Sequence, residues 1–134
     1  MKNILPLILT TILFFAGCGE DHSHITADSL EASIKDGSAT VIDVNGTASF
    51  NAGHIPGAID FEANEAKLAE LLPRDKGAMI VAYCGGPGCN AYQDGLDAAK
   101  ALGYSNLQHY SGGIKGWKEA GKSVETAEAE PAAN

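Results

Sequence analysis

The stretch that decides the fold is residues 78–89, which read AMIVAYCGGPGC. Its first six residues are almost all apolar, as in a strand that is buried on both faces of a parallel sheet. The glycines and the proline after Cys84 end this strand, and residues 91–102 form a helix-favouring run that Gly103 closes. This order of strand, loop and helix places Cys84 at the carboxyl end of a parallel strand, where open α/β sheets bind ligands.

Strand and helix alternate on both sides of this stretch. A short, β-branched and nearly all apolar run predicts a strand at residues 39–44, and two more short strands are expected at residues 58–60 and 107–110. Runs with helical spacing of apolar residues predict further helices, after the N-cap Thr26 and at residues 63–72 and 113–120. Because such alternation requires parallel strand pairing, we expect an α/β three-layer sandwich: a central parallel β-sheet with helices on both faces.

Length and composition limit the possible classes of protein. The chain has 134 residues, of which 45% are hydrophobic and 19% charged, so one compact domain is expected. Its formal net charge is −8, and Arg74 is the single arginine. Without a basic surface to neutralise phosphates, nucleic acid is not expected as a partner.

The N-terminal residues 1–17 have the pattern of a secretory signal peptide. A lysine near the start is followed by an apolar run from Ile4 to Phe15, which is shorter than the roughly 20 residues of a membrane-spanning helix. The end of this segment, Phe15-Ala16-Gly17-Cys18, resembles the lipobox of bacterial lipoprotein precursors. An ordinary secreted protein that is cut near Ala16, or an uncleaved anchor, remains the alternative.

The lipoprotein resemblance implies that Cys18 becomes the first residue and carries lipid. Several acyl chains hold a protein stably on a membrane, whereas a single chain binds marginally. Gly19 stands where an aspartate would favour the inner membrane, so a lipid-anchored protein of the cell envelope is expected, on the periplasmic face of the outer membrane in a Gram-negative cell.

The mature chain is then expected to have three parts. Residues 18–24 are a polar tether, residues 25–122 are the folded domain, and residues 123–134 are a disordered tail. The tail is rich in alanine and glutamate and has no aromatic residue, so it cannot bury enough apolar surface to fold.

The loop after Cys84 favours thiolate chemistry. Its three glycines let the backbone turn N–H groups inward, and the following helix adds positive charge from its N-terminus. This environment binds anions and lowers a thiol pKa into the range of about 3.5–7.5. Cys84 is therefore the candidate nucleophile, although a plain tight turn would need the same glycines.

The residues from about 25 to 122 resemble a single-domain rhodanese, in the order and spacing of several motifs. These motifs are Ile42-Asp43-Val44, Phe50, Gly53-His54-Ile55-Pro56-Gly57-Ala58, Tyr83-Cys84 with its glycine loop, Gly103-Tyr104 and Tyr110-Ser111-Gly112-Gly113-Ile114-Lys115-Gly116-Trp117. The resemblance implies a rhodanese-like sandwich and sulfurtransferase activity, without a metal or an organic cofactor.

In such an enzyme Cys84 attacks a sulfur donor such as thiosulfate, polysulfide or a persulfide, and becomes a persulfide itself. It then passes the sulfane sulfur to a thiol acceptor or to cyanide. The loop that would bind the donor and the persulfide consists of Gly85, Gly86, Pro87, Gly88 and Cys89. Its backbone amides act on the developing negative charge as an oxyanion hole does.

Three departures from the family pattern limit this transfer of function. Many active rhodaneses place an arginine in the loop, and no cationic residue occurs between Cys84 and Asn90. Asn45 stands where the family often has a second arginine, so weak thiosulfate binding is expected. Asn90 also excludes the related phosphatases, which need an arginine at that place. Asp43 and His54 are interpreted as structural residues near the site.

Cys89 supports a rival function. Outside the cytoplasm disulfides persist, and a spacing of five residues allows Cys84 and Cys89 to pair if their Cα atoms lie about 4.4–6.8 Å apart. Cys89 could then resolve a sulfenic acid or persulfide on Cys84, which would make the protein a thiol-disulfide enzyme or sensor. Alternatively Cys89 is a buried unpaired thiol. A non-catalytic binding module of the same fold is a third hypothesis.

Overall fold

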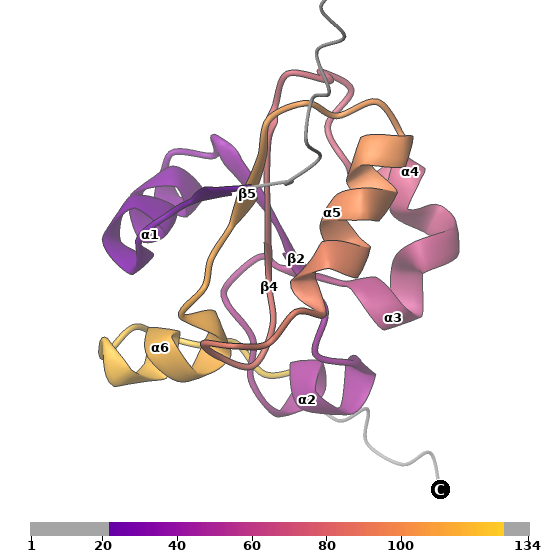
Figure 1. Ribbon diagram of the computed structural model, residues 1–134. Helices are drawn as coiled ribbons and strands as arrows, with labels where there is room; N and C mark the ends of the chain where they lie inside the picture. The colour runs from indigo at the N-terminus through magenta and orange to yellow at the C-terminus, as the bar shows by residue number, and fades with distance from the viewer. Residues whose placement is uncertain (1–21, 128–134) are drawn as a thin grey trace, which may run out of the picture.

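The structure, a computed structural model, describes residues 22–127. Within this range the chain forms a parallel sheet of five strands in the order β1-β5-β4-β2-β3. The strands are β1 (Ser23–His24), β2 (Ala39–Asp43), β3 (Ile59–Asp60), β4 (Met79–Tyr83) and β5 (Leu107–His109). Helices cover both faces of the sheet, as Figure 1 shows, so the predicted α/β sandwich is confirmed.

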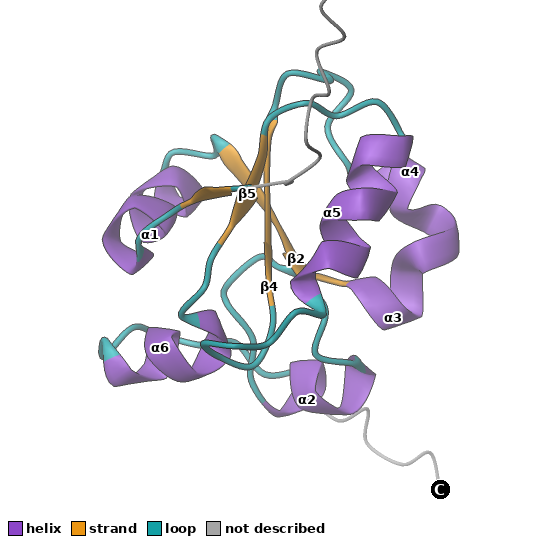
Figure 2. Cartoon of the chain, viewed as in Figure 1, coloured by secondary structure: helices purple, strands orange, loops and turns teal. Residues whose placement is uncertain are grey.

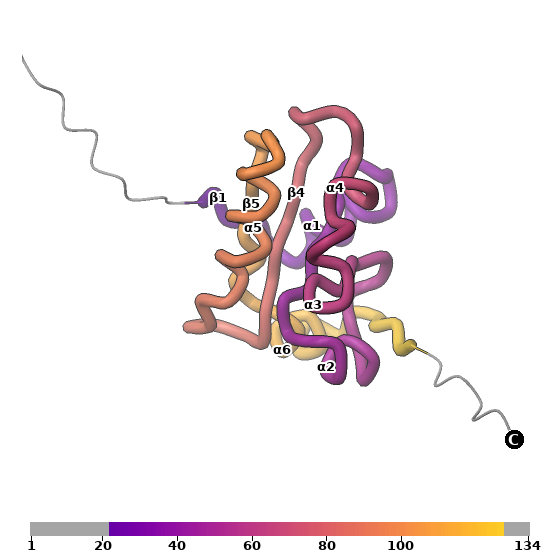
Figure 3. The backbone as a smooth tube through the Cα atoms, turned by 90° about the vertical axis from the view of Figure 1, so that its right-hand side faces the viewer, coloured from indigo at the N-terminus to yellow at the C-terminus, as the bar shows by residue number. Residues whose placement is uncertain are grey.

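Two groups of helices form the outer layers. The helices are α1 (Ala27–Lys35), α2 (Thr47–Ala52), α3 (Phe61–Asn64), α4 (Leu68–Leu71), α5 (Tyr92–Ala101) and α6 (Gly113–Glu119). Helices α1 and α6 lie on one side of the sheet, and α3, α4 and α5 lie on the other (Figures 1 and 3). Each face of the sheet therefore has its own apolar core, and the strands are buried on both sides.

The two cores follow from the alternation of side chains along the strands. On the α1 and α6 side the buried cluster consists of Ile25, Leu30, Val41, Ile55, Val81, Tyr83, Tyr110 and Trp117. On the other side it consists of Ile42, Leu68, Leu72, Ile80, Ala82, Leu96, Ala99 and Tyr104. Neighbouring residues of β4 thus point to opposite layers, which explains why its sequence is apolar throughout.

The prediction of a single helix at residues 63–72 is wrong. Instead α3 ends at Asn64, a 3₁₀ turn follows at Glu65–Lys67, and α4 begins at Leu68. The side-chain amide of Asn64 donates a hydrogen bond to the backbone oxygen of Asp60 (2.9 Å). Such local side-chain bonding competes with helix continuation, and Asn64 has non-helical backbone angles.

The polar tether predicted at residues 18–24 needs a correction at its end. Ser23 and His24 form strand β1, which pairs in parallel with Gln108 and His109 at the edge of the sheet. Without β1, the outer side of β5 would leave its backbone groups unpaired, so a short neighbouring segment is bound there.

The predicted signal peptide, residues 1–17, and Cys18 lie outside the described residues. Among residues 22–127 no helix has the length and apolar character needed to cross a bilayer.

The new edge strand brings histidines together. The rings of His24 and His109 lie 5.2 Å apart between centroids, and the ring of Tyr92 stacks on His109. The buried Nδ1 atom of His109 has no hydrogen-bond partner within residues 22–127. Burial and the neighbouring His24 and His22 lower the pKa of His109 to about 4, so its ring stays neutral at this edge at neutral pH.

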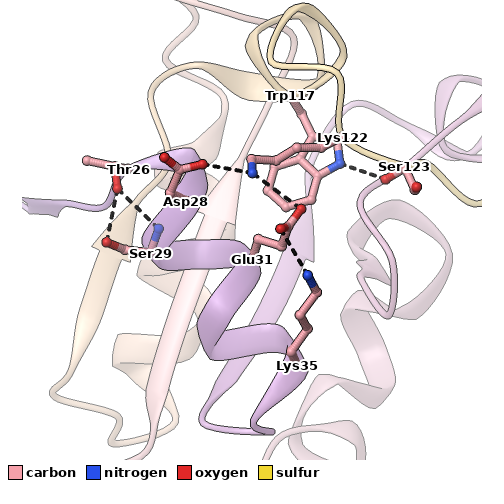
Figure 4. Close-up of polar contacts among 8 residues, drawn as sticks. All are labelled: Thr26, Asp28, Ser29, Glu31, Lys35, Trp117, Lys122 and Ser123. Atoms are coloured by element: carbon pink, nitrogen blue, oxygen red, sulfur yellow. Dashed lines mark hydrogen bonds and ion pairs between the residues drawn. The ribbon is translucent and has the colours of Figure 1, made fainter.

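The C-terminal end of the domain is held by Lys122 and Ser123, as Figure 4 shows. The Nζ atom of Lys122 lies 2.9 Å from Oδ1 of Asp28 and 3.3 Å from Oε2 of Glu31, both on α1. The indole N–H of Trp117 donates to the backbone oxygen of Ser123 (2.8 Å). These contacts join the segment after α6 to the first helix.

The predicted boundary of the disordered tail, residues 123–134, is therefore wrong, because the ordered domain extends beyond residue 123. Glu125 and His54 exchange two backbone hydrogen bonds of 2.9 Å each, and the N–H of Ala127 donates to the oxygen of Asn51 (3.2 Å). The alanine- and glutamate-rich composition did not indicate this pairing, because backbone groups supply it. Residues 128–134 lie outside the described range.

The loop between β4 and α5 rests on the start of α6. The N–H groups of Ile114 and Lys115 donate to the backbone oxygens of Cys84 and Gly85, at 3.0 Å each. Gly113 has φ +61° and lies so close to the loop that a Cβ atom there would be 2.5 Å from the oxygen of Cys84. Only glycine allows this contact, which fixes the position of the loop.

We predict that Gly113→Ala destabilises the fold more than Gly37→Ala. Both glycines have positive φ, so both changes carry backbone strain of about 1–2 kcal/mol. At Gly37 nothing lies within 4 Å of a new Cβ, whereas at Gly113 the overlap adds about 1–3 kcal/mol. Urea unfolding of both variants measures the difference, and equal midpoints would contradict the close contact.

Candidate functional site

Cys84 lies directly after β4, the middle strand of the sheet. Strand β4 pairs with β2 along its whole length and with β5 over three residues, so its end is fixed from both sides. Cys84 is buried, with 2% of its surface exposed. The structure thus places the predicted nucleophile at the carboxyl end of the central strand, as the sequence indicated.

The loop after Cys84, drawn in teal between β4 and α5 in Figure 2, contains a tight turn at residues 86–89. The N–H of Cys89 donates to the oxygen of Gly86 (3.2 Å), with Pro87 and Gly88 between them. Gly88 has φ +84°. A proline followed by a residue with positive φ is the pattern of a type II turn. This turn reverses the chain and brings Cys89 back toward Cys84.

Cys84 and Cys89 form a disulfide, with their Cα atoms 6.3 Å apart. Of the two alternatives for Cys89, the structure therefore contains the pair and not a buried unpaired thiol. The two sulfurs differ in access, because Cys84 is buried whereas Cys89 is partly exposed. A reagent from solvent thus meets the Cys89 side of the disulfide first.

The backbone of the loop directs its carbonyl oxygens and its N–H groups to different partners. The oxygens of Cys84 and Gly85 accept hydrogen bonds from α6, as described above. Within residues 22–127 the N–H groups of Gly85, Gly86 and Gly88 donate to no acceptor of the protein. The part of the fold that the structure describes therefore leaves these three N–H groups unused, and anion binding by the loop stays a prediction.

Lys115 is a site residue that the sequence did not indicate. Its side chain lies against Gly86, since a Cβ atom built on that glycine would be 3.5 Å from Cβ and 3.7 Å from Cδ of Lys115. The ammonium group is exposed and lies 3.7 Å from Oε1 of Glu119 on the same helix. The loop itself has no cation, but α6 thus supplies one beside it.

Asp43 makes its contacts within the fold. Its Oδ1 accepts from the N–H of Asn45 (2.8 Å), and its Oδ2 accepts from the hydroxyl of Tyr83 (2.5 Å). The Tyr83 oxygen also accepts from the N–H of Ile55 (3.0 Å). Burial raises the pKa of the Asp43 carboxyl, although the Tyr83 hydrogen bond opposes this shift. Asp43 thus links the ends of β2 and β4 to the turn before β3, as a structural residue does.

His54 also bonds to elements of the fold. Its Nδ1 lies 2.8 Å from the backbone oxygen of Phe50, and its ring stacks on the Phe50 ring with centroids 3.7 Å apart. Its Nε2 lies 3.6 Å from Oε2 of Glu125. These contacts support the structural interpretation of His54. Within residues 22–127 no group of three or more His, Cys, Asp or Glu side chains is arranged to hold a metal ion.

Several solved protein structures have a fold similar to that of this chain. A rhodanese-related protein of Thermoplasma volcanium is 26% identical, with a TM-score of 0.60, over 79% of this chain and 100% of that one. A human single-domain sulfurtransferase is 23% identical, with a TM-score of 0.57, over 72% of this chain and 95% of that one. The second likeness shows the fold alone.

A helix-turn-helix-type transcriptional regulator of Mycobacterium tuberculosis is 34% identical over 110 residues. The match covers 80% of this chain but 46% of the regulator, so the chain spans about half the length of this relative. Residues 26–120 match the family described as the rhodanese-like domain. By this match, and by the sheet and the cysteine loop described above, the chain belongs to the rhodanese-like domain family.

Proposed function

We propose that this protein is a sulfurtransferase that carries sulfane sulfur as a persulfide on Cys84. The observation that carries the proposal is the position of Cys84, at the end of the central strand and before a loop with three N–H groups that no acceptor among residues 22–127 occupies. Such donors stabilise a thiolate and the negative charge of a persulfide. Membership of the rhodanese-like domain family, over residues 26–120, supports the same assignment.

The reaction begins with reduction of the Cys84–Cys89 disulfide by an external dithiol, which is itself oxidised to a disulfide, because Cys84 Sγ is bonded to Cys89 in the structure. The Cys84 thiolate then attacks the outer sulfur of a donor. With thiosulfate, the bond between the two donor sulfurs breaks and sulfite leaves with the electron pair. The outer sulfur stays on Cys84 as a persulfide. A thiol or cyanide afterwards takes this sulfur and releases the Cys84 thiolate.

The disulfide favours a second candidate function. A protein that cycles between the Cys84–Cys89 disulfide and the dithiol could exchange electrons with other thiols without carrying sulfur. The partly exposed Cys89 would be the point of attack for such a partner. Sulfur uptake on Cys84 separates the two candidates, because a pure thiol-disulfide protein takes up none.

We also propose that the protein is anchored to the cell envelope by lipid on Cys18. The lipobox-like segment before this cysteine supports the proposal. The Cys84–Cys89 disulfide agrees with it, because disulfides persist in oxidising compartments outside the cytoplasm. A sulfur donor and a thiol acceptor would then be small molecules of the same compartment.

Sulfur transfer to cyanide is predicted to require Cys84. The reduced protein should form thiocyanate from polysulfide or thiosulfate, and Cys84→Ser should form none, because the proposal assigns the sulfur-carrying thiol to Cys84. Thiocyanate is measured by its iron complex, with protein omitted as the blank. Equal thiocyanate formation by Cys84→Ser and the unchanged protein would contradict the assignment.

Lys115 is predicted to bind the anionic donor. Lys115→Gln should raise the KM for thiosulfate about 1.4- to fivefold, since an exposed charge pair contributes about 0.2–1 kcal/mol. Lys118→Gln is the matched control, because Lys118 lies on the same helix but its Nζ lies near Gly53, 3.6 Å from a Cβ atom built there. A KM for a neutral organic trisulfide should not change. An equal rise in both variants would indicate a general charge effect instead.

Lipid attachment is predicted at Cys18. Cells that express the protein and grow with radiolabelled palmitate should yield a labelled protein in the membrane fraction. Cys18→Ala should lose this label, because the thiol that carries the diacylglycerol is missing. Absence of label from the unchanged protein would refute the anchor, and label retained by Cys18→Ala would place the lipid elsewhere.

A further inference from the structure

We infer that Cys89 ends the sulfur-carrying state by expelling the outer sulfur of the Cys84 persulfide as hydrosulfide. The protein then acts as a dithiol-dependent reductase of sulfane sulfur, in addition to any transfer to acceptors. This inference rests on the proposed function, since it needs a persulfide on Cys84. It assigns to Cys89 a role as a second catalytic residue.

The first argument is geometric. Cys89 already bonds to Cys84 Sγ in the structure, and this atom becomes the inner sulfur of the persulfide. The turn at residues 86–89 fixes the return of the chain through the hydrogen bond from Cys89 to Gly86 and the positive φ of Gly88. The thiol of Cys89 can therefore reach the inner sulfur without a rearrangement of the fold.

The chemical step balances with these two residues and the bound sulfur. The Cys89 thiolate attacks Sγ of Cys84, and a new bond forms between the two cysteine sulfurs. The bond from Sγ to the outer sulfur breaks, and the outer sulfur leaves with the electron pair and a proton as HS⁻. The sulfane sulfur gains two electrons, and the two cysteines lose two electrons as they form the disulfide.

Regeneration needs a dithiol reductant from outside the chain. One thiolate of this reductant attacks the sulfur of Cys89, which is partly exposed, whereas Cys84 is buried. Cys84 then leaves as the thiolate, at the start of a loop in which the N–H groups of Gly85, Gly86 and Gly88 have no acceptor among the described residues. The second thiol of the reductant releases Cys89. Because the reductant attacks the more exposed Cys89, Cys84 is released as a thiolate. The thiolate is the form that attacks the next sulfur donor.

A single-turnover experiment tests the inference. The protein and Cys89→Ser are reduced, freed of reductant under anaerobic conditions, and exposed to thiosulfate that is isotopically labelled in its outer sulfur. A second arm uses labelled inorganic polysulfide, followed by rapid desalting. Labelled hydrosulfide, labelled persulfide on Cys84 and the Cys84–Cys89 disulfide are then measured over time.

The expected result is that the unchanged protein releases labelled hydrosulfide and forms the disulfide without added reductant. Cys89→Ser should lose this release completely and keep the label as a persulfide on Cys84. If both proteins keep the persulfide equally long, the inference is wrong while the proposed function stands. If Cys89→Ser takes up label from neither donor, the proposed function fails and the inference fails with it.

A backbone variant tests the role of the turn without removing a thiol. Gly88→Ala strains a residue that has nothing within 4 Å of a new Cβ, and Gly37→Ala is the matched control with the same property at φ +76°. Hydrosulfide release should slow about five- to thirtyfold in Gly88→Ala, the factor that corresponds to about 1–2 kcal/mol of strain. Gly37→Ala should keep the original rate. Equal rates in all three proteins would overturn the role of the turn.

Discussion

The site depends on two hydrogen bonds from the first turn of α6 to the loop after β4. Because the oxygens of Cys84 and Gly85 accept from Ile114 and Lys115, the loop backbone has a fixed direction. Two of its carbonyl groups are used by the fold, while the N–H groups of Gly85, Gly86 and Gly88 have no acceptor in the described part of the chain. The contact also brings the side chain of Lys115 against Gly86, so one interaction sets both the amide donors and the nearby charge.

The sheet could be predicted because its strands are buried on both faces. Residues 78–83 and 39–44 are mostly apolar for that reason, and parallel pairing follows from the helices between them. Strand β1 could not be predicted in the same way, because Ser23 and His24 carry no apolar pattern and are bound through the backbone groups of β5. The break at Asn64 was also missed, since helix propensity does not report a side-chain bond to Asp60.

The residues of the candidate site also fall into two groups, those that the sequence predicted and those that it did not. Cys84 and the turn with Pro87 and Gly88 are local features, so their sequence predicts them. The state of Cys89 remained open, because five residues of spacing allow a disulfide without requiring one. Lys115 was missed because its proximity to Gly86 arises only when α6 packs on the loop. Local chemistry was therefore predictable, whereas contacts between distant segments needed the folded chain.

The edge strand β1 has a consequence for how closely the domain approaches a membrane. The chain from Cys18 to Ser23 can extend by at most about 18 Å. If Cys18 carries lipid as proposed, this short reach holds the β5 edge of the sheet next to the phospholipid headgroups. Rotation of the domain above the bilayer is then restricted by the short connection to strand β1.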